Sequence, residues 1–146
     1  MVNKISIAGN VKGNLRLTGP QGEKNNDDFV LRVGLVVEGN KRMNFVQRAM
    51  APGWVRELES LAAKHSGLGH IEFFNIVQQQ ELVGRSRTHP KSDLLHENFV
   101  WFLKQGQFKF THELSEALRI VAIWLAIDGD DTKSKFQVDL ASLRLN

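Results

Sequence analysis

Cysteine is absent from the 146-residue chain, and this absence excludes disulfide bonds and thiolate metal sites. Long apolar runs are also missing. The longest, residues 120–127, fits a buried strand and is far shorter than the ~20 residues that a membrane-spanning helix needs. No apolar signal segment follows Met1. We therefore expect a cytoplasmic protein with no membrane partner.

Motifs of enzymes and of metal-binding proteins are missing as well. The five histidines do not form the His-x-x-x-His pair that metal-binding helices use. Neither a phosphate-binding Gly-x-x-x-x-Gly-Lys nor a Gly-x-Ser-x-Gly nucleophile motif occurs. The acidic residues at 128–131 fit a turn better than a calcium loop, whose distal Glu is absent. We expect no catalytic residue, no metal, no cofactor and no enzyme activity.

Basic residues are gathered in two segments. The chain has 19 Lys and Arg against 16 Asp and Glu, which gives a formal net charge of +3. Residues 39–56 contain Lys41, Arg42, Arg48 and Arg56 and no acid, and residues 83–92 form a second basic segment without an acid. Such segregation of charge is typical of a protein that faces a polyanion.

The periodicity of apolar residues predicts mostly strands. Residues 29–37 alternate between apolar side chains on one face and other side chains on the opposite face, which is a strong strand pattern. Residues 54–65 have apolar side chains at helical spacing and are followed by glycines that can end a helix. The other predicted elements are strands at 4–16, 43–50 and 71–83, a hairpin turn at 38–41, an exposed loop at 85–93, hairpins at 99–110 and 119–145, and an optional short helix at 112–118.

This order of elements predicts an all-β protein with one or two short helices. Three strands, a helix and then further strands match the OB-fold, a five-stranded Greek-key barrel, here with additional C-terminal β-hairpins. An α+β sandwich has the same order and stays open as an alternative. We assign residues 1–104 to the OB-fold core and residues 105–146 to a C-terminal β extension. The extension is expected to pack on the core or at a subunit interface of a homo-oligomer, because one barrel cannot bury so many apolar strands.

The first strand carries a family resemblance. Residues 3–10, Asn-Lys-Ile-Ser-Ile-Ala-Gly-Asn, resemble the opening strand of the bacterial single-stranded DNA-binding proteins. The pattern of strands and helix up to about residue 83 is similar to that family. The resemblance implies an OB-fold that binds single-stranded DNA with little sequence preference, in DNA replication or DNA repair. The chain departs from the family at residues 138–146, which are strand-like and have no acidic tip.

Binding of this kind needs cations for the phosphates and aromatic ring faces for the bases. Phe45 and Arg48 have opposite parity on the predicted strand, so we expect them on opposite faces. Trp101 lies in a strand that is apolar on both faces, which makes it a candidate for stacking. The predicted nucleic-acid-binding residues are Arg42, Arg48, Trp54, Arg56, Arg85, Arg87, Lys91, Trp101 and Lys104.

Two other functions fit the same sequence. The first is a replication accessory or protein-interaction OB domain, whose surface would bind a protein or a structured RNA. The second is a structural subunit of a larger assembly, docked through its apolar C-terminal strands. The sequence does not choose between DNA and RNA as the ligand.

Overall fold

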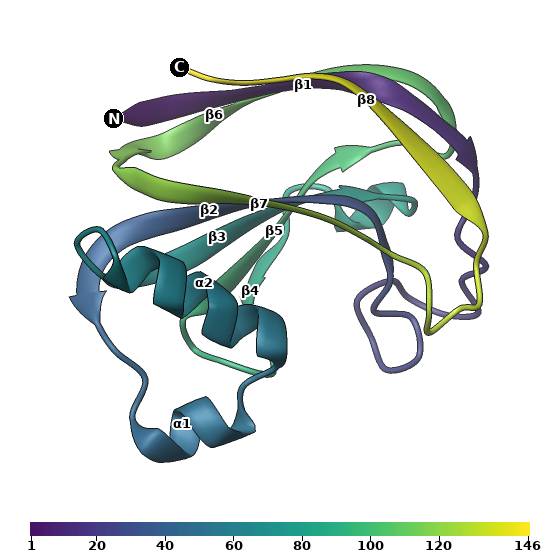
Figure 1. Ribbon diagram of the computed structural model, residues 1–146. Coiled ribbons are helices and arrows are strands. Elements are labelled where there is room, and N and C mark those ends of the chain that lie inside the picture. Colours follow the sequence, from purple (N-terminus) through teal and green to yellow (C-terminus); the bar gives the residue numbers. More distant parts are fainter.

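Two β-sheets lie face to face, and helices lie on the outer side of the larger sheet (Figure 1). The computed structural model describes residues 1–146. In chain order the elements are β1 (Val2–Gly13), β2 (Phe29–Lys41), α1 (Phe45–Met50), α2 (Gly53–Ala63), β3 (Leu68–Val77), η1 (Gln80–Leu82), β4 (Ser86–Thr88), β5 (Leu95–Phe102), β6 (Gly106–Leu118), β7 (Ile120–Asp128) and β8 (Phe136–Leu145). The predicted class, mostly β with short helices, is confirmed. No helix combines the length and the apolar content that crossing a membrane would need.

The two sheets are open and do not form a closed barrel. The smaller sheet has the order β6-β1-β8, and the larger has the order β4-β5-β3-β2-β7. All neighbouring strands are antiparallel except β3 and β5, which are parallel. Both α-helices come between β2 and β3, whereas the sequence predicted one helix between a third and a fourth strand.

The N-terminal and C-terminal parts of the chain share one sheet. Strand β1 lies between β6 and β8 and pairs with both of them. Residues 105–146 therefore pack on the rest of the chain, and they supply both neighbours of its first strand. The predicted boundary at residue 104 does not coincide with a boundary between structural units.

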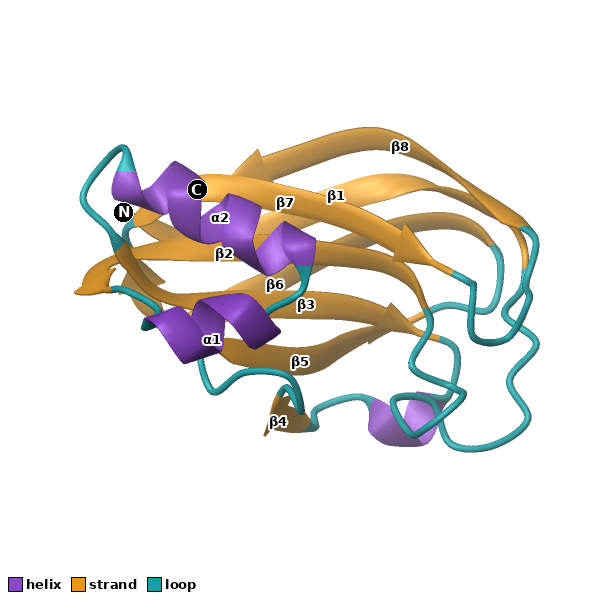
Figure 2. Ribbon diagram, turned by 60° about the horizontal axis from the view of Figure 1, so that its bottom comes forward, coloured by secondary structure: helices purple, strands orange, loops and turns teal.

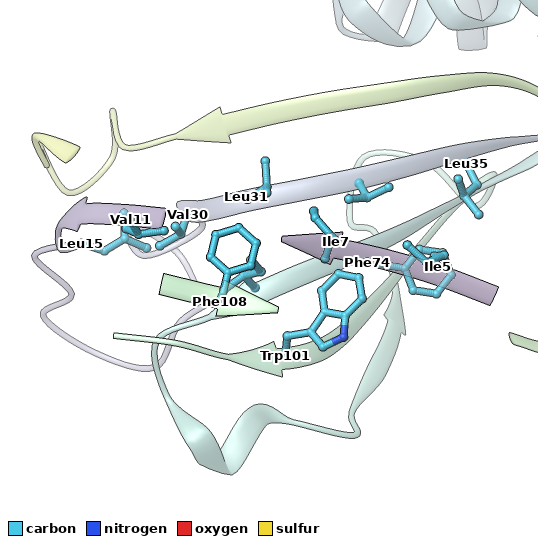
Figure 3. Close-up of a cluster of buried hydrophobic side chains, with 12 residues drawn as sticks. Ile5, Ile7, Val11, Leu15, Val30, Leu31, Leu35, Phe74, Trp101 and Phe108 are labelled. Carbon is cyan, nitrogen blue, oxygen red and sulfur yellow. The ribbon is translucent and has the colours of Figure 1, made fainter. Parts of the chain in front are cut away.

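The main core lies between the two sheets (Figure 3). Ile5, Ile7 and Val11 alternate along β1 and are buried against Leu31 and Leu35 of β2. All of residues 29–37 are buried, because the smaller sheet covers one face of β2 and α2 with the loop before β2 covers the other. The strand predicted from the period-two pattern is confirmed.

Residues 43–50 do not form the predicted strand, and residues 38–41 do not form a hairpin turn. Strand β2 continues to Lys41, and α1 follows. A capping box begins α1, in which the Asn44 side chain accepts from Gln47 N at 2.8 Å and the Gln47 side chain accepts from Asn44 N at 3.0 Å. These two bonds satisfy backbone donors that a helix start otherwise leaves free. The Asn-x-x-Gln pattern, rather than the apolar alternation, decided the local structure.

The predicted helix at residues 54–65 is confirmed as α2. Val55, Leu58 and Ala62 lie on one side of it and pack on the apolar side chains of β2 and β3. Gly67 follows with φ +103° and donates its N–H to the carbonyl of Ala62. Glycine adopts this left-handed conformation without the steric cost that other residues incur.

The C-terminal strands cross between the sheets and do not form hairpins. Strand β5 pairs with β3 and β4, whereas β6 pairs with β1. In the same way β7 pairs with β2, and β8 pairs with β1. The predicted hairpins at 99–110 and 119–145 are therefore wrong in their pairing, and residues 112–118 belong to β6. Consecutive strands with a short connection have the same sequence pattern whether they pair or change sheets.

Candidate nucleic-acid interface

Helix α1 lies on the surface with no buried residue, next to α2 (Figure 2). Phe45, Val46 and Met50 are 87 %, 62 % and 82 % exposed. A helix of this length is not stable by itself in water, so its neighbours must hold it in place. Three large apolar side chains together in water are typical of a contact surface.

Two arginines attach α1 to α2. Arg48 Nη2 lies 3.1 Å from Glu59 Oε2, in an ion pair whose geometry gives no hydrogen bond, while Glu59 Oε1 accepts from Met43 N at 2.7 Å. Arg56 Nη1 donates to the carbonyl oxygens of Ala51 and Arg48, at 3.1 and 3.4 Å. These carbonyls lie at the C-terminal end of α1, where a positive charge is stabilised by the helix dipole.

The segment that forms the two helices carries a surplus of positive charge. Residues 41–65 include five basic and two acidic side chains, a surplus of three, and the formal net charge of the chain is +3. One of these acids, Glu59, is buried beside Arg48. Exposed basic residues here that form no ion pair are Lys41, Arg42, Arg56, Lys64 and Lys91. The solvent therefore meets a positive surface that a polyanion would approach.

Lys91 belongs to this surface although it lies far along the chain. A hollow of about 230 Å³ lies between α1 and the loop from β4 to β5, and its lining includes Met43, Gln47, Met50 and residues 91–94. We call the whole surface the helical face. Its members are Lys41, Arg42, Phe45, Val46, Arg48, Met50, Arg56, Lys64 and Lys91.

Trp54 lies beneath the helical face and has one side of its ring covered. Its indole stacks on Trp124 with ring centroids 4.9 Å apart and an interplanar angle of 9°. The same ring lies 5.9 Å from Phe73, and its residue is half-buried. Trp54 therefore anchors α2 to the larger sheet through the ring face that stacks on Trp124.

Arg87 lies away from the helical face and is held by carboxylates. Its Nε donates to Glu97 Oε2 at 2.7 Å, its Nη2 lies 3.3 Å from Asp27 Oδ1, and its Nη1 donates to the carbonyl of Gly22. The predicted exposed loop at 85–93 instead contains β4 and the buried His89. These contacts give Arg87 a structural role, whereas the sequence predicted it as a nucleic-acid-binding residue in an exposed loop.

The other predicted residues do not join the helical face. Trp101 is 5 % exposed in the core, with its ring 5.9 Å from that of Phe110, so it offers no open face to a base. Arg85 is exposed between η1 and β4, and Lys104 is exposed between β5 and β6. The structure thus brings together Arg42, Arg48, Arg56 and Lys91, with Trp54 beneath them, and separates the remaining four.

Phe45 lies on the helical face but is not among the nucleic-acid-binding residues predicted from the sequence. Strand parity placed it opposite Arg48, but in a helix residues three apart lie on the same face. Its ring is the most exposed of the large apolar side chains in the protein. The signal for it was the capping pattern at Asn44 and Gln47, which predicts a helix start.

The acidic residues near 128–131 lie at the turn between β7 and β8, and this turn is held by the carboxylate of Asp28. The carboxylate of Asp28 accepts from the backbone N–H of Asp131 at 3.1 Å and of Thr132 at 2.7 Å. Both oxygens of this buried carboxylate are therefore engaged by the turn itself, in agreement with the predicted turn.

The chain was compared with protein-family models, with curated proteins and with solved structures, and it matches none of them.

Proposed function

We propose that the protein binds single-stranded nucleic acid through the helical face. The observation that carries this proposal is the 87 % exposed ring of Phe45 on the helical face, which also contains the exposed basic residues Arg42, Arg56 and Lys91, none of which forms an ion pair. Arg42, Arg56 and Lys91 would neutralise phosphates, and Phe45 would offer a ring on which a base stacks. These are the two contributions that binding of single strands requires.

Such a surface would bind many sequences alike. Phosphate contacts are the same for every nucleotide, and every base has a face that can stack on a phenyl ring. The proposed role is to cover exposed strands, as in DNA replication or repair, and RNA is a ligand of the same chemistry. Kinship with the bacterial single-stranded DNA-binding proteins and their OB-fold belongs to this proposal, and residues 3–10 are its support.

The proposal is tested by fluorescence anisotropy of a labelled oligo-dT at low salt, with wild type and Phe45→Ala. Loss of the ring should weaken binding by ~1–3 kcal/mol, about 5- to 150-fold. The melting temperature should change little, because Phe45 is 87 % exposed and buries very little surface in the fold.

Val83→Ala is the matched control, since Val83 is also exposed, at 42 %, but lies between η1 and β4. It should bind like wild type. Unchanged affinity of Phe45→Ala would remove the stacking surface from the proposal. Failure of the wild type to bind oligo-dT would favour the second function, a surface that docks a protein.

Assembly as a homo-oligomer is the second part of the proposal, and it concerns β7. This strand is an edge of the larger sheet, and residues 120–127 contain no charged side chain. Ile123, Leu125 and Ile127 are 47 %, 43 % and 54 % exposed. Edge strands of monomers are usually protected by charges or bulges, so we propose that β7 of a second copy pairs with it about a two-fold axis.

Light scattering after size exclusion would test this assembly. The wild type should have at least twice the mass of one chain, and Leu125→Lys should reduce the mass to that of one chain. Val83→Lys, the same change away from the edge, should keep the assembly. A wild type of single-chain mass at micromolar concentration would contradict the proposal.

A further inference from the structure

A polar cleft opens between the two sheets on the side away from β7 and β8. It has a volume of about 630 Å³, and its lining comes from both sheets. Glu72 of β3 and His96 and Asn98 of β5 line it from the larger sheet, and His112 and Glu113 of β6 line it from the smaller. The cleft exists because the edges β4 and β6 are not joined by hydrogen bonds.

Strand register brings three metal-binding side chains together beside this cleft: Glu72 and His96 line it, and His70 adjoins Glu72. His70 and Glu72 are two residues apart on β3, so their side chains share a face. His96 is the direct partner of Glu72 on the parallel strand β5. Leu35 pairs with Glu72 on the other side and belongs to the core between the sheets, so the three side chains lie on the inner face of the sheet, opposite the helices.

One carboxylate oxygen is shared by the two imidazoles. Glu72 Oε1 lies 3.1 Å from His70 Nε2 and 2.8 Å from His96 Nδ1. The two rings are stacked with centroids 4.9 Å apart, and the three donor atoms all lie within 4.8 Å of one another. Tetrahedral zinc bonds of 2.0–2.1 Å separate neighbouring ligand atoms by roughly 3.3–3.5 Å. The two nitrogen–oxygen separations are a few tenths of an ångström shorter than this, and the two nitrogens lie within 4.8 Å of each other, so adjustments of the side chains alone would admit an ion.

Asn98 fixes the orientation of the carboxylate. Its Nδ2 donates to Glu72 Oε2 at 2.7 Å and to the backbone carbonyl of Phe73 at 3.1 Å. The second oxygen of Glu72 is thereby occupied, and the first is directed to the histidines. Metal ligands in proteins are commonly oriented by such hydrogen bonds from a neighbouring residue.

We propose that His70, Glu72 and His96 bind a divalent transition metal, with Zn²⁺ as the best match. Two imidazoles and one carboxylate form a ligand set that zinc uses where a fourth position stays open, and the cleft has room for a water molecule or a small anion there. The four-residue spacing of a helical metal motif is absent from the sequence, because these three ligands lie on strands. On a strand the equivalent pattern is His-x-Glu, with the third ligand from the neighbouring strand. This site is separate from the helical face and independent of the proposed function.

The test is calorimetric titration of chelator-treated protein with ZnCl₂, together with the ligand-field absorption of Co²⁺ added in its place. Wild type should bind one Zn²⁺ per chain, and Co²⁺ should give a tetrahedral spectrum. Glu72→Gln and His96→Ala should each abolish both signals. Asn98→Ala should weaken binding by roughly 10- to 100-fold, as loss of an orienting hydrogen bond does.

His65→Ala is the control, because His65 is exposed just beyond the end of α2 and belongs to no cluster. It should bind zinc like wild type. Circular dichroism of each variant separates loss of the site from loss of the fold, and His96→Ala, which truncates the most exposed of the three ligands, is the variant least expected to disturb folding. Absence of one-to-one binding in wild type, or full binding by folded Glu72→Gln, would overturn the proposal. Oligo-dT binding by the same variants should be unchanged, so the two proposals fail independently.

Discussion

Arginines in two parts of the molecule have opposite surroundings. Arg32 and Arg87 both contact Glu97, whose side chain is fully buried. Arg42 and Arg56, on the helical face, contact no carboxylate and are exposed. The comparison teaches that an arginine is structural where a buried carboxylate fixes it, and available to a ligand where only water and backbone carbonyls contact it.

The buried Arg32 has partners of three kinds. Arg32 forms an ion pair with Glu97, donates from Nε to Asn75 Oδ1 at 2.8 Å, and lies over the ring of Phe29 at 3.9 Å. Burial lowers the pKa of Arg32, and the negative charge of Glu97 opposes that shift. Such a pair is costly to break, because the remaining charge has no access to water.

The largest effect is expected from Glu97→Gln. The change leaves Arg32, with its side chain 5 % exposed, without a countercharge, and breaking a buried pair usually costs about 3–5 kcal/mol of unfolding free energy. Urea denaturation measures it. Glu57→Gln on the exposed surface of α2 should cost less than about 0.5 kcal/mol. A loss for Glu97→Gln as small as that of Glu57→Gln would erase the distinction between the two groups of arginines.

The second-largest effect is expected on the stability of the fold at low pH. Burial lowers the pKa of His89 to about 4, a shift that Arg32, Arg87 and Lys91 reinforce and Glu97 opposes. The unfolded chain takes up this proton near pH 6.5 and the folded protein only near pH 4. Stability from His89 is therefore complete above pH 6.5 and is lost as the pH falls towards 4, by up to about 3 kcal/mol.

Urea denaturation of wild type and His89→Asn between pH 7 and pH 4 measures this difference. Asn has no proton to gain, and its carbonyl oxygen can accept the Lys91 N–H that His89 Nδ1 accepts at 3.1 Å. The variant should lose less stability than wild type across this window. Asp27, whose pKa is raised by burial and by Glu97, is present in both proteins, so its contribution to the pH dependence cancels in the comparison. Parallel curves would show that His89 is not the titrating group.

A smaller effect separates Arg87 from Arg85. Arg87→Ala removes contacts with Glu97 and Asp27 and should cost about 1–3 kcal/mol of unfolding free energy. Arg85→Ala removes an exposed side chain that forms no ion pair, and it should cost under about 0.5 kcal/mol. Thermal denaturation distinguishes the two. Equal melting temperatures would restore Arg87 as a free surface cation.

The smallest effect is on the salt dependence of binding. If Arg42 and Arg56 each contact a phosphate, replacing both by Gln should make the slope of log K against log salt shallower by about 1.4, since each contact contributes about 0.7. Arg56→Gln also removes the hydrogen bonds to the carbonyls of Ala51 and Arg48 that hold α1, so circular dichroism of each variant is measured with the titration. Replacing Arg16 and Arg144, exposed arginines on other elements, is the control and should leave the slope as it is. If the slope became shallower for the Arg16 and Arg144 variant and not for the Arg42 and Arg56 variant, the binding surface would lie elsewhere than on the helical face.

Much of the local structure followed from the sequence. The alternation in residues 29–37 predicted β2, and the helical spacing in residues 54–65 predicted α2 with its glycine end. Both patterns reflect backbone geometry within a few residues. The strand predicted at residues 43–50 was wrong. The apolar alternation there favours a strand, but the two hydrogen bonds of the capping box at Asn44 and Gln47 favoured a helix.

The sequence by itself determined the mostly β class, the basic segment around residues 41–56 and the absence of thiol chemistry. Only the tertiary structure decided which strands pair and that Phe45 faces solvent. It also decided that Arg87 forms an ion pair with Glu97, and that His70, Glu72 and His96 lie together beside one cleft. The reason is the range of the forces involved. Alternation and caps act between residues a few positions apart, whereas strand partners are chosen by the burial that the whole chain achieves once its loops have closed.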